Sequence, residues 1–376
     1  SLWIWVLNIM IFQRLYGEQQ NAGKSPLMKW ASTGALILLP MIVSVAMYTT
    51  HEETTASAEV VVVQPNFEPH YEKFERFSEE QQVARFIELS VPLVDENTDY
   101  LVFPESSYGF VKEKDVAGSP STLRILNALA EYPQLKLVTG LNAYHDFEEG
   151  EARTSATRTR ERGGRTIEFE VTNLAAQIPV DQSIAPQTYR KSKLVPGPEA
   201  FPFQQILFFM KPVVDALGGT AAGLGTQEKR SAFSSETGAV APVICYESVF
   251  GEYFAGYVRD GKAQTAFIMT NDGWWDNTAG HRQHLYYASL RAIETRRSIA
   301  RSANTGISCF LNQRGDILQP TKYNEAIAIK GEVALNDEVT FYVRWGDIIA
   351  RIAVFLSILA LLNAFVKARI KKGDEA

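Results

Sequence analysis

Cysteine and histidine are scarce in this sequence, and a strong net charge is absent. The 376 residues include two cysteines and five histidines. Two cysteines cannot form a disulfide framework, and there is no CxxC pair or His/Cys cluster to predict a zinc site. We therefore expect no metal and no cofactor. The formal net charge of −6 gives no electrostatic reason to expect a nucleic-acid partner.

Long apolar runs occur near both ends of the chain. Residues 31–49 carry no charge, and residues 348–366 carry one, Arg351, near their start. Each run is close to the ~20 residues that a membrane helix needs. Membrane helices tolerate an internal proline such as Pro40, and an arginine near a helix end can reach the interface. The alternative for each run is a buried core helix, but two such runs favour a membrane protein.

Basic residues flank both runs. KARIKK follows the second run, and Arg14, Lys24 and Lys29 precede the first. Cytoplasmic flanks are enriched in lysine and arginine, so both flanks are predicted to lie inside and the segment between them on the outer face. Residues 1–12 are apolar but too short to span a membrane. We interpret them as the end of a further, truncated helix rather than a signal peptide, because they lack a basic start and a cleavage site.

The segment between the runs alternates short apolar strands with amphipathic helices. This alternation predicts an α/β fold, and the hairpin-like ends predict a mixed sheet. Expected strands cover 58–66, 99–105, 135–144, 241–247 and 266–272, expected helices cover 79–94, 122–132 and 282–298, and a hairpin covers 306–318. The predicted domains are membrane helices at 1–50, a catalytic domain at 58–338 and a transmembrane helix at 346–368.

Two segments do not fit this alternation. Residues 148–166 are polar, and we expect a mobile surface loop there. Residues 203–235 join an apolar stretch to a glycine-rich one. They form either a core helix with a flexible turn or a lid that touches lipid through the apolar residues Ile206, Leu207, Phe208 and Phe209.

Three residues at the ends of predicted strands could form one catalytic site. Cys245 ends an apolar run where a helix pattern begins, Glu105 follows LVFP, and Lys191 follows TYR. Strand ends gather at one edge of an α/β sheet. There a helix N-terminus and a cation would lower the thiol pKa, and a carboxylate could accept the proton. Taken singly, these residues are more typical of a core cysteine, a helix cap and a surface charge than of a catalytic site.

The order FPES, YRKSKLVP, ICYE and TNDGWW resembles the signature of the carbon–nitrogen hydrolase, or nitrilase, superfamily over about residues 58–335. The resemblance implies an αββα sandwich. It also implies that Glu105 is the general base, Lys191 the cation that stabilises the oxyanion, and Cys245 the nucleophile.

With its flanking apolar helices, the chain is most similar to the bacterial apolipoprotein N-acyltransferase family. KLVPGPEAFP resembles that family's segment with a second essential glutamate, here Glu199, and TNDGWWDNTAGHRQHL and RSANTGIS resemble later segments. The resemblance implies a multi-pass protein of the bacterial inner membrane with its catalytic domain on the periplasmic face. A phospholipid would donate an acyl chain to Cys245, and a diacylglyceryl-lipoprotein would accept it on its N-terminal amine. Members of that family usually carry several further N-terminal helices.

Further residues are assigned supporting or structural roles. Glu199 would position Lys191 or the entering amine, and Trp274 and Trp275 would line an apolar pocket or simply pack. Tyr246 and Glu247 would shape the site, although Glu247 is equally typical of a first-turn helix charge. The residues expected to be structural are Cys309, in a core strand, and His281 and His284, for which the sequence offers no Asp or Cys partner.

Two other functions fit parts of this pattern. A membrane-tethered amidase or nitrilase would use the same three residues with water as the acceptor and a small C–N substrate. A non-catalytic binding protein could also use the nitrilase fold. The apolar anchors argue against the first alternative, and the complete set of Glu105, Lys191 and Cys245 argues against the second.

Overall fold

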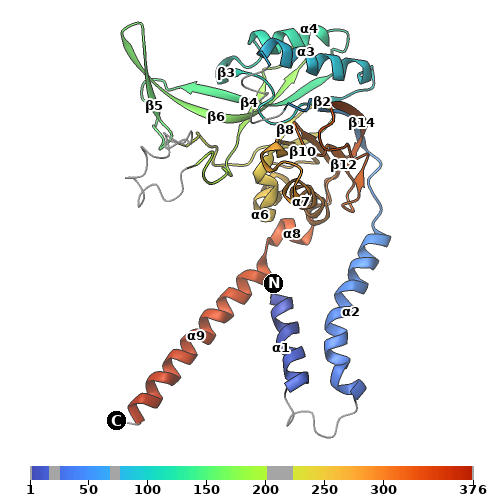
Figure 1. Ribbon diagram of the computed structural model, residues 1–376, viewed down its shortest axis with the longest axis vertical. Coiled ribbons are helices and arrows are strands. Elements are labelled where there is room, and N and C mark those ends of the chain that lie inside the picture. Colours follow the sequence, from blue (N-terminus) through green and yellow to red (C-terminus); the bar gives the residue numbers. More distant parts are fainter. Residues whose placement is uncertain (1, 17–25, 68–76, 201–222, 375–376) are drawn as a thin grey trace. The chain divides into compact units, whose positions relative to one another are not determined.

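The computed structural model describes residues 2–16, 26–67, 77–200 and 223–374 (Figure 1). The chain divides into two compact units. One unit consists of Ser1–Glu52 with Trp345–Ala376, and the other consists of Glu53–Arg344. The apolar segment with Ile206 and its neighbours lies outside the described residues.

The smaller unit is helical. Two of its helices, at Trp30–Thr50 and Ile348–Lys367, are long and apolar enough to cross a membrane, with mean hydropathies of 1.8 and 2.3. Only 6% and 0% of these spans are buried, so the alternative of a core helix is wrong. The helix bounds are α1 Leu2–Tyr16, α2 Pro26–Thr50 and α9 Ile348–Asp374.

The first two helices of this unit contact each other directly. The indole Nε1 of Trp3 in α1 donates a hydrogen bond to the carbonyl oxygen of Leu36 in α2 at 2.9 Å. Arg14, near the other end of α1, donates to the hydroxyl of Ser32 at 3.2 Å. The apolar stretch predicted at the start of the chain is therefore a helix packed on the first candidate span.

The larger unit contains two stacked β-sheets (Figure 1). The first has the order β14-β1-β2-β4-β6-β5, with β3 beside β4 and β7 beside β6, and the second has the order β13-β12-β11-β10-β9-β8. Both combine parallel and antiparallel pairs, so the predicted mixed sheet is confirmed. The strands are β1 Ser57–Gln64, β2 Tyr100–Val102, β3 Phe110–Lys112, β4 Lys136–Asp146, β5 Arg158–Arg162, β6 Arg165–Pro179, β7 Gln187–Arg190, β8 Phe233–Ser234, β9 Ala239–Ile244, β10 Thr265–Thr270, β11 Ile299–Ala303, β12 Cys309–Leu311, β13 Ile317–Leu318 and β14 Ile327–Ala334.

The valine run of β1 explains why the first sheet is covered on both faces. Side chains alternate across a strand. Val60 and Val62 therefore join the core shared with the second sheet, while Val61 and Val63 join the core under the outer helices. A continuous apolar run is typical of such doubly buried strands.

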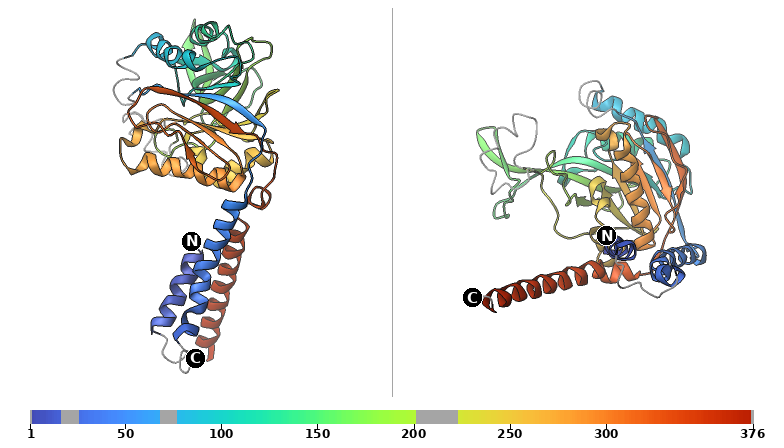
Figure 2. Two further views of the ribbon diagram at one scale, coloured as in Figure 1. Left: turned by 90° about the vertical axis from the view of Figure 1, so that its right-hand side faces the viewer. Right: turned by 60° about the horizontal axis from the view of Figure 1, so that its bottom comes forward.

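Helices cover the outer face of each sheet (Figure 2). Those on the first sheet begin at Ser78, which caps α3 reciprocally with Gln81, and at Ser119, which caps α4. The resulting order of helix, sheet, sheet and helix confirms the predicted αββα sandwich. The helix bounds are α3 Glu79–Ser90, η2 Val91–Leu93, η3 Glu113–Asp115, α4 Pro120–Ala128, η5 Cys245–Val249, α6 Gly251–Arg259, η6 Asp272–Trp275, α7 Ala279–Thr295 and α8 Phe341–Trp345.

The surface loop expected at residues 148–166 is wrong. Much of the polar segment 148–166 belongs to a hairpin instead of a loop, because β5 pairs with β6 from Arg158↔Phe169 to Arg162↔Arg165. Gly163 and Gly164 form its turn with φ of 60° and 75°. A two-residue glycine turn with positive φ is a hairpin signal, and the polar composition of the segment obscured it.

We predict that Phe267→Ala destabilises the sandwich by about 3 kcal/mol or more, because it empties a fully buried site between the sheets. Phe267 also stacks edge-on against Tyr100, with ring centroids 5.1 Å apart. Phe110→Ala is the matched control, since Phe110 is 63% exposed. Chemical unfolding in detergent should separate the two variants. Equal losses of stability would contradict this assignment of the core.

Candidate active site

The loop after β2 holds Glu105 against β4. Gly140 N donates to the Pro104 carbonyl at 3.1 Å, and Ser107 N donates to the Gly140 carbonyl at 2.8 Å. A Cβ atom at Gly140 would lie 2.7 Å from the Cα of Glu105. Only glycine allows this approach, so β4 determines where the carboxylate lies.

Lys191 follows β7 and is held by β6. Its backbone N–H donates to the carbonyl of Asn173 at 2.8 Å, and its side chain is 1% exposed. The ammonium Nζ lies 2.8 Å from Oε1 of Glu105 and 2.7 Å from Oε1 of Glu199. The Asn173 amide donates to the same two oxygens at 2.8 and 3.3 Å. One buried cation and one amide therefore hold two carboxylates together.

Cys245 follows β9 in a strained backbone conformation. Its φ is +46°, in the left-handed region that non-glycine residues seldom occupy. The residue is 6% exposed, and its thiol hydrogen-bonds with Glu105 and with Thr270. The α-helix predicted to begin immediately after the cysteine is wrong. A 3₁₀ turn, η5, comes first, and α6 begins only at Gly251.

The three predicted residues come together, but not at the edge of one sheet. Glu105 and Lys191 follow strands of the first sheet, whereas Cys245 follows β9 of the second. The expectation of a single sheet edge is therefore wrong. The site lies where the two sheets meet, and the short apolar strands give no signal of which sheet each one joins.

The buried charges determine the ionisation of the site. Burial opposes the charge on Lys191, but the carboxylates of Glu105 and Glu199 outweigh it and raise its pKa. Burial alone would raise the pKa of Glu105, yet Lys191, Asn173 and Cys245 hold it below its ordinary value. The ion pair is therefore charged at neutral pH.

The predicted lowering of the cysteine pKa is wrong. Burial and the neighbouring Glu105 carboxylate raise the pKa of Cys245, and Lys191 only partly opposes them. The resting site holds a neutral thiol beside an ionised carboxylate. Such a thiol becomes nucleophilic only as its proton passes to a base, and Glu105 accepts its hydrogen bond.

Glu247 is a buried anchor for both reactive segments. It is fully buried, and its oxygens accept from Ser192 N at 2.8 Å and from Ile244 N at 3.0 Å. Burial raises its pKa. Because these two N–H groups adjoin Lys191 and Cys245, the carboxyl group links the two segments. Three tyrosine hydroxyls complete its shell, those of Tyr189, Tyr253 and Tyr257.

The aromatic candidates lie nearer the surface. Tyr246 packs edge-on against Phe250, with ring centroids 5.1 Å apart. Trp274 and Trp275 are 55% and 38% exposed. The Trp275 ring lies 5.3 Å from the imidazole of His284, which contacts the Cys245 carbonyl, so Trp275 borders the surroundings of Cys245 while remaining accessible.

The expectation that His284 lacks an acidic or cysteine partner is wrong. Its Nδ1 lies 2.9 Å from Oδ1 of Asp272, and its Nε2 lies 3.1 Å from the carbonyl oxygen of Cys245. His281 is also buried, with its ring 4.6 Å from that of Tyr323. Cys309 is fully buried in the core.

Sequence reasoning missed Asn173, Asp272 and Arg301. Asn173 lies in the middle of a long strand and gave no signal. Asp272 stands within TNDGWW beside the predicted site, and its position directly after a buried strand could have identified it. Arg301 lies in a buried strand, and a fully buried arginine implies a buried acidic partner.

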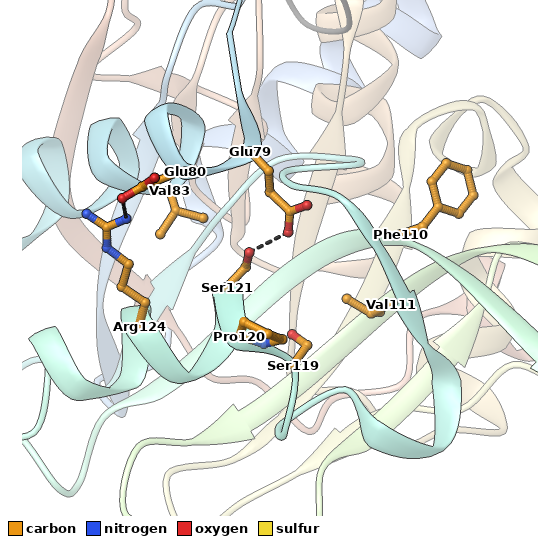
Figure 3. A pocket seen from close by; sticks show the side chains of 9 residues that line it. All are labelled: Glu79, Glu80, Val83, Phe110, Val111, Ser119, Pro120, Ser121 and Arg124. Atoms are coloured by element: carbon orange, nitrogen blue, oxygen red, sulfur yellow. Dashed lines mark hydrogen bonds and ion pairs between the residues drawn. The ribbon is translucent and has the colours of Figure 1, made fainter.

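A cavity of about 360 Å³ lies near the start of α3 and α4 and contains none of the predicted site residues (Figure 3). A hydrogen bond from Ser121 to Glu79 and an ion pair between Arg124 and Glu80 join the two helices there. The described lining residues are Glu79, Glu80, Val83, Phe110, Val111, Ser119, Pro120, Ser121 and Arg124.

Comparisons with known proteins agree with the fold. The carbon–nitrogen hydrolase family matches residues 50–338, and the chain belongs to this family. The predicted family is thus confirmed. A solved carbon–nitrogen hydrolase superfamily protein from Xanthomonas campestris is similar over 74% of this chain and 91% of its own, with a TM-score of 0.50 and 13% identity.

Curated relatives narrow the resemblance. The apolipoprotein N-acyltransferase of Chlorobaculum tepidum is 25% identical over 383 residues, which cover 98% of this chain and 68% of the relative. That of Geobacter metallireducens is 32% identical over 160 residues, which cover 43% of this chain and 30% of the relative. The chain therefore spans between about a third and two thirds of the length of these relatives.

We predict that Lys191→Met destabilises the protein by about 3 kcal/mol at pH 7, because buried carboxylates lose their cation. In the parent protein the lowered pKa of Glu105 contributes stability that is present above its unfolded value and is lost as pH falls through the folded value. In the variant, burial raises that pKa instead. The difference in free energy of unfolding between the parent and Lys191→Met should therefore shrink as pH falls toward about 4.

The control is Lys193→Met, which makes the same change at an exposed residue over the rings of Phe250 and Tyr253. It should cost less than about 1 kcal/mol. Chemical unfolding at several pH values measures both variants. If the loss of stability caused by Lys191→Met stays constant with pH, the assigned charge pairing is refuted.

Proposed function

We propose that this chain is a membrane-bound N-acyltransferase. It would move a fatty acyl chain from a phospholipid to the N-terminal amine of a diacylglyceryl-cysteine lipoprotein, by way of a thioester on Cys245. The observation that carries the proposal is the contact of a neutral thiol, an ionised carboxylate and a buried ammonium at Cys245, Glu105 and Lys191. The similarity to curated N-acyltransferases supports the choice of reaction.

In the first step, Glu105 accepts the thiol proton as the Cys245 sulfur attacks the ester carbonyl carbon of the phospholipid. The carbonyl oxygen becomes an oxyanion, which the Lys191 ammonium and nearby backbone N–H groups stabilise. When the tetrahedral intermediate collapses, the C–O ester bond breaks. The departing alkoxide takes the proton back from Glu105, which leaves a lysophospholipid and an acyl-thioester.

In the second step, the acceptor amine attacks the thioester carbonyl and passes a proton to Glu105. The C–S bond breaks, an amide forms, and the Cys245 sulfur regains the proton from Glu105. The same carboxylate therefore acts as base and as acid in both steps. Glu199, 2.7 Å from the ammonium, keeps Lys191 in place throughout.

Two features outside the triad support a lipid substrate. Two exposed helices long and apolar enough to cross a membrane adjoin the catalytic unit in sequence. Trp274 and Trp275 are apolar yet accessible, and Trp275 contacts the residue that touches the Cys245 carbonyl. We propose that these indoles line the path of the acyl chain, and that the domain faces the periplasm of a bacterial inner membrane.

The direct test is the intact mass of the full chain after incubation with dipalmitoyl phosphatidylethanolamine in detergent. We expect one added palmitoyl group that hydroxylamine removes, as a thioester requires. Cys245→Ala should abolish the adduct without changing the unfolding temperature, and Cys309→Ala should retain it, since that cysteine lies in the core. An absent adduct, together with hydrolysis of small amides, would overturn the proposal in favour of a membrane-tethered amidase.

Glu105→Gln tests the role of the base. A neutral amide keeps the shape of the side chain but cannot take the thiol proton, so acylation of Cys245 should slow by about 100-fold or more. Glu113→Gln is a suitable control, because this carboxylate pairs with Arg190, whereas Glu105 pairs with Lys191. Time-resolved mass spectrometry of the adduct gives both rates. An unchanged rate for Glu105→Gln would exclude it as the base.

A further inference from the structure

A second charged cluster lies beneath the nucleophile. It consists of Asp272 after β10, His284 in α7 and Arg301 in β11, which are 0%, 3% and 0% exposed. The Arg301 guanidinium lies 2.6 Å from Oδ2 of Asp272, and His284 Nδ1 lies 2.9 Å from Oδ1. Burial alone would raise the pKa of Asp272, but Arg301 and His284 hold it well below its ordinary value. The carboxylate is therefore charged and lies within hydrogen-bonding distance of both partners.

The other ring nitrogen of His284 reaches the nucleophile's own backbone. Its Nε2 lies 3.1 Å from the carbonyl oxygen of Cys245 and 2.9 Å from Oγ of Ser248. A backbone carbonyl can only accept a hydrogen bond, so this contact requires a hydrogen on Nε2. The Nδ1 lies 2.9 Å from Oδ1 of Asp272 and 3.3 Å from Nη2 of Arg301. Asp272 and Arg301 therefore hold the ring so that Nε2 donates to the Cys245 carbonyl.

The accepting carbonyl belongs to the residue with the strained backbone. A non-glycine residue in the left-handed region costs free energy and persists only where its surroundings hold it. The Ser248 hydroxyl donates to the same Cys245 carbonyl at 2.8 Å. Two donors therefore hold the peptide that determines where the thiol points.

We propose that His284, oriented by Asp272, is a positioning residue that holds the Cys245 backbone so that its thiol meets Glu105. The inference rests on the proposed function only in using acylation of Cys245 as its readout. Glu247 holds the residue before the nucleophile through Ile244 N, and His284 holds the nucleophile's own carbonyl. The turn at Cys245 is thus held on one side by Glu247 and on the other by His284, which Asp272 orients.

The experiment compares His284→Leu, His284→Gln and the control His281→Leu in the full chain. The adduct formed with dipalmitoyl phosphatidylethanolamine is followed in time over a range of lipid concentrations. His284→Leu removes the donor, and small misplacements of a reacting group cost about 100-fold in rate. We expect a fall of that size in the saturating acylation rate, with a half-saturating lipid concentration that stays within threefold. Glutamine has an amide N–H and should recover most of the lost rate.

His281→Leu reports what a buried histidine of the same helix contributes by packing alone, and thermal unfolding of each variant reports stability. If His284→Leu acylates at the parent rate, or if His284→Gln is as slow as His284→Leu despite an unchanged unfolding temperature, the inference is overturned. If His284→Leu fails to fold, the glutamine variant against His281→Leu decides the question. If the parent chain forms no adduct, the proposed function fails instead, so the two failures are distinguishable.

Discussion

The placement of one buried ammonium between two carboxylates is the constraint on which the site depends. Lys191 is 1% exposed and lies within 2.8 Å of both Glu105 and Glu199. A buried charge of this kind is tolerated only when it is paired and hydrogen-bonded. The pairing keeps Glu105 ionised, and the proposed general-base activation of the thiol requires an ionised Glu105 beside a neutral Cys245. The strands that carry these residues must therefore meet accurately.

The fold meets that requirement by holding each reactive residue through its backbone. Gly140 allows the Glu105 loop to lie against β4, and the carbonyl of Asn173 holds the peptide of Lys191. The Glu247 carboxyl bridges the segments next to Lys191 and Cys245. Two stacked sheets supply these contacts. The layers that bury the valines of β1 therefore also hold Glu105, Lys191 and Cys245 in place.

Much of this arrangement was predictable because the signals are local. The valine run before Gln64, the capped helix after Ser78 and the hairpin at Gly315 follow from side-chain alternation, capping and turn geometry. The hairpin at Gly163 was missed because its strands are polar and project from the sandwich, so that they lack an apolar period (Figures 1 and 2). The raised pKa of Cys245 was missed because burial is a property of the folded chain.

By itself the sequence determined the two apolar spans, the alternation of strands and helices and the family signature around Cys245. These depend on composition and on neighbours within a few residues. Only the tertiary structure decided that two sheets share the site, that Asn173 holds both glutamates, and that Asp272, His284 and Arg301 lie beneath Cys245. Those contacts join residues far apart in the chain, and their energies depend on distance and burial, which no local pattern encodes.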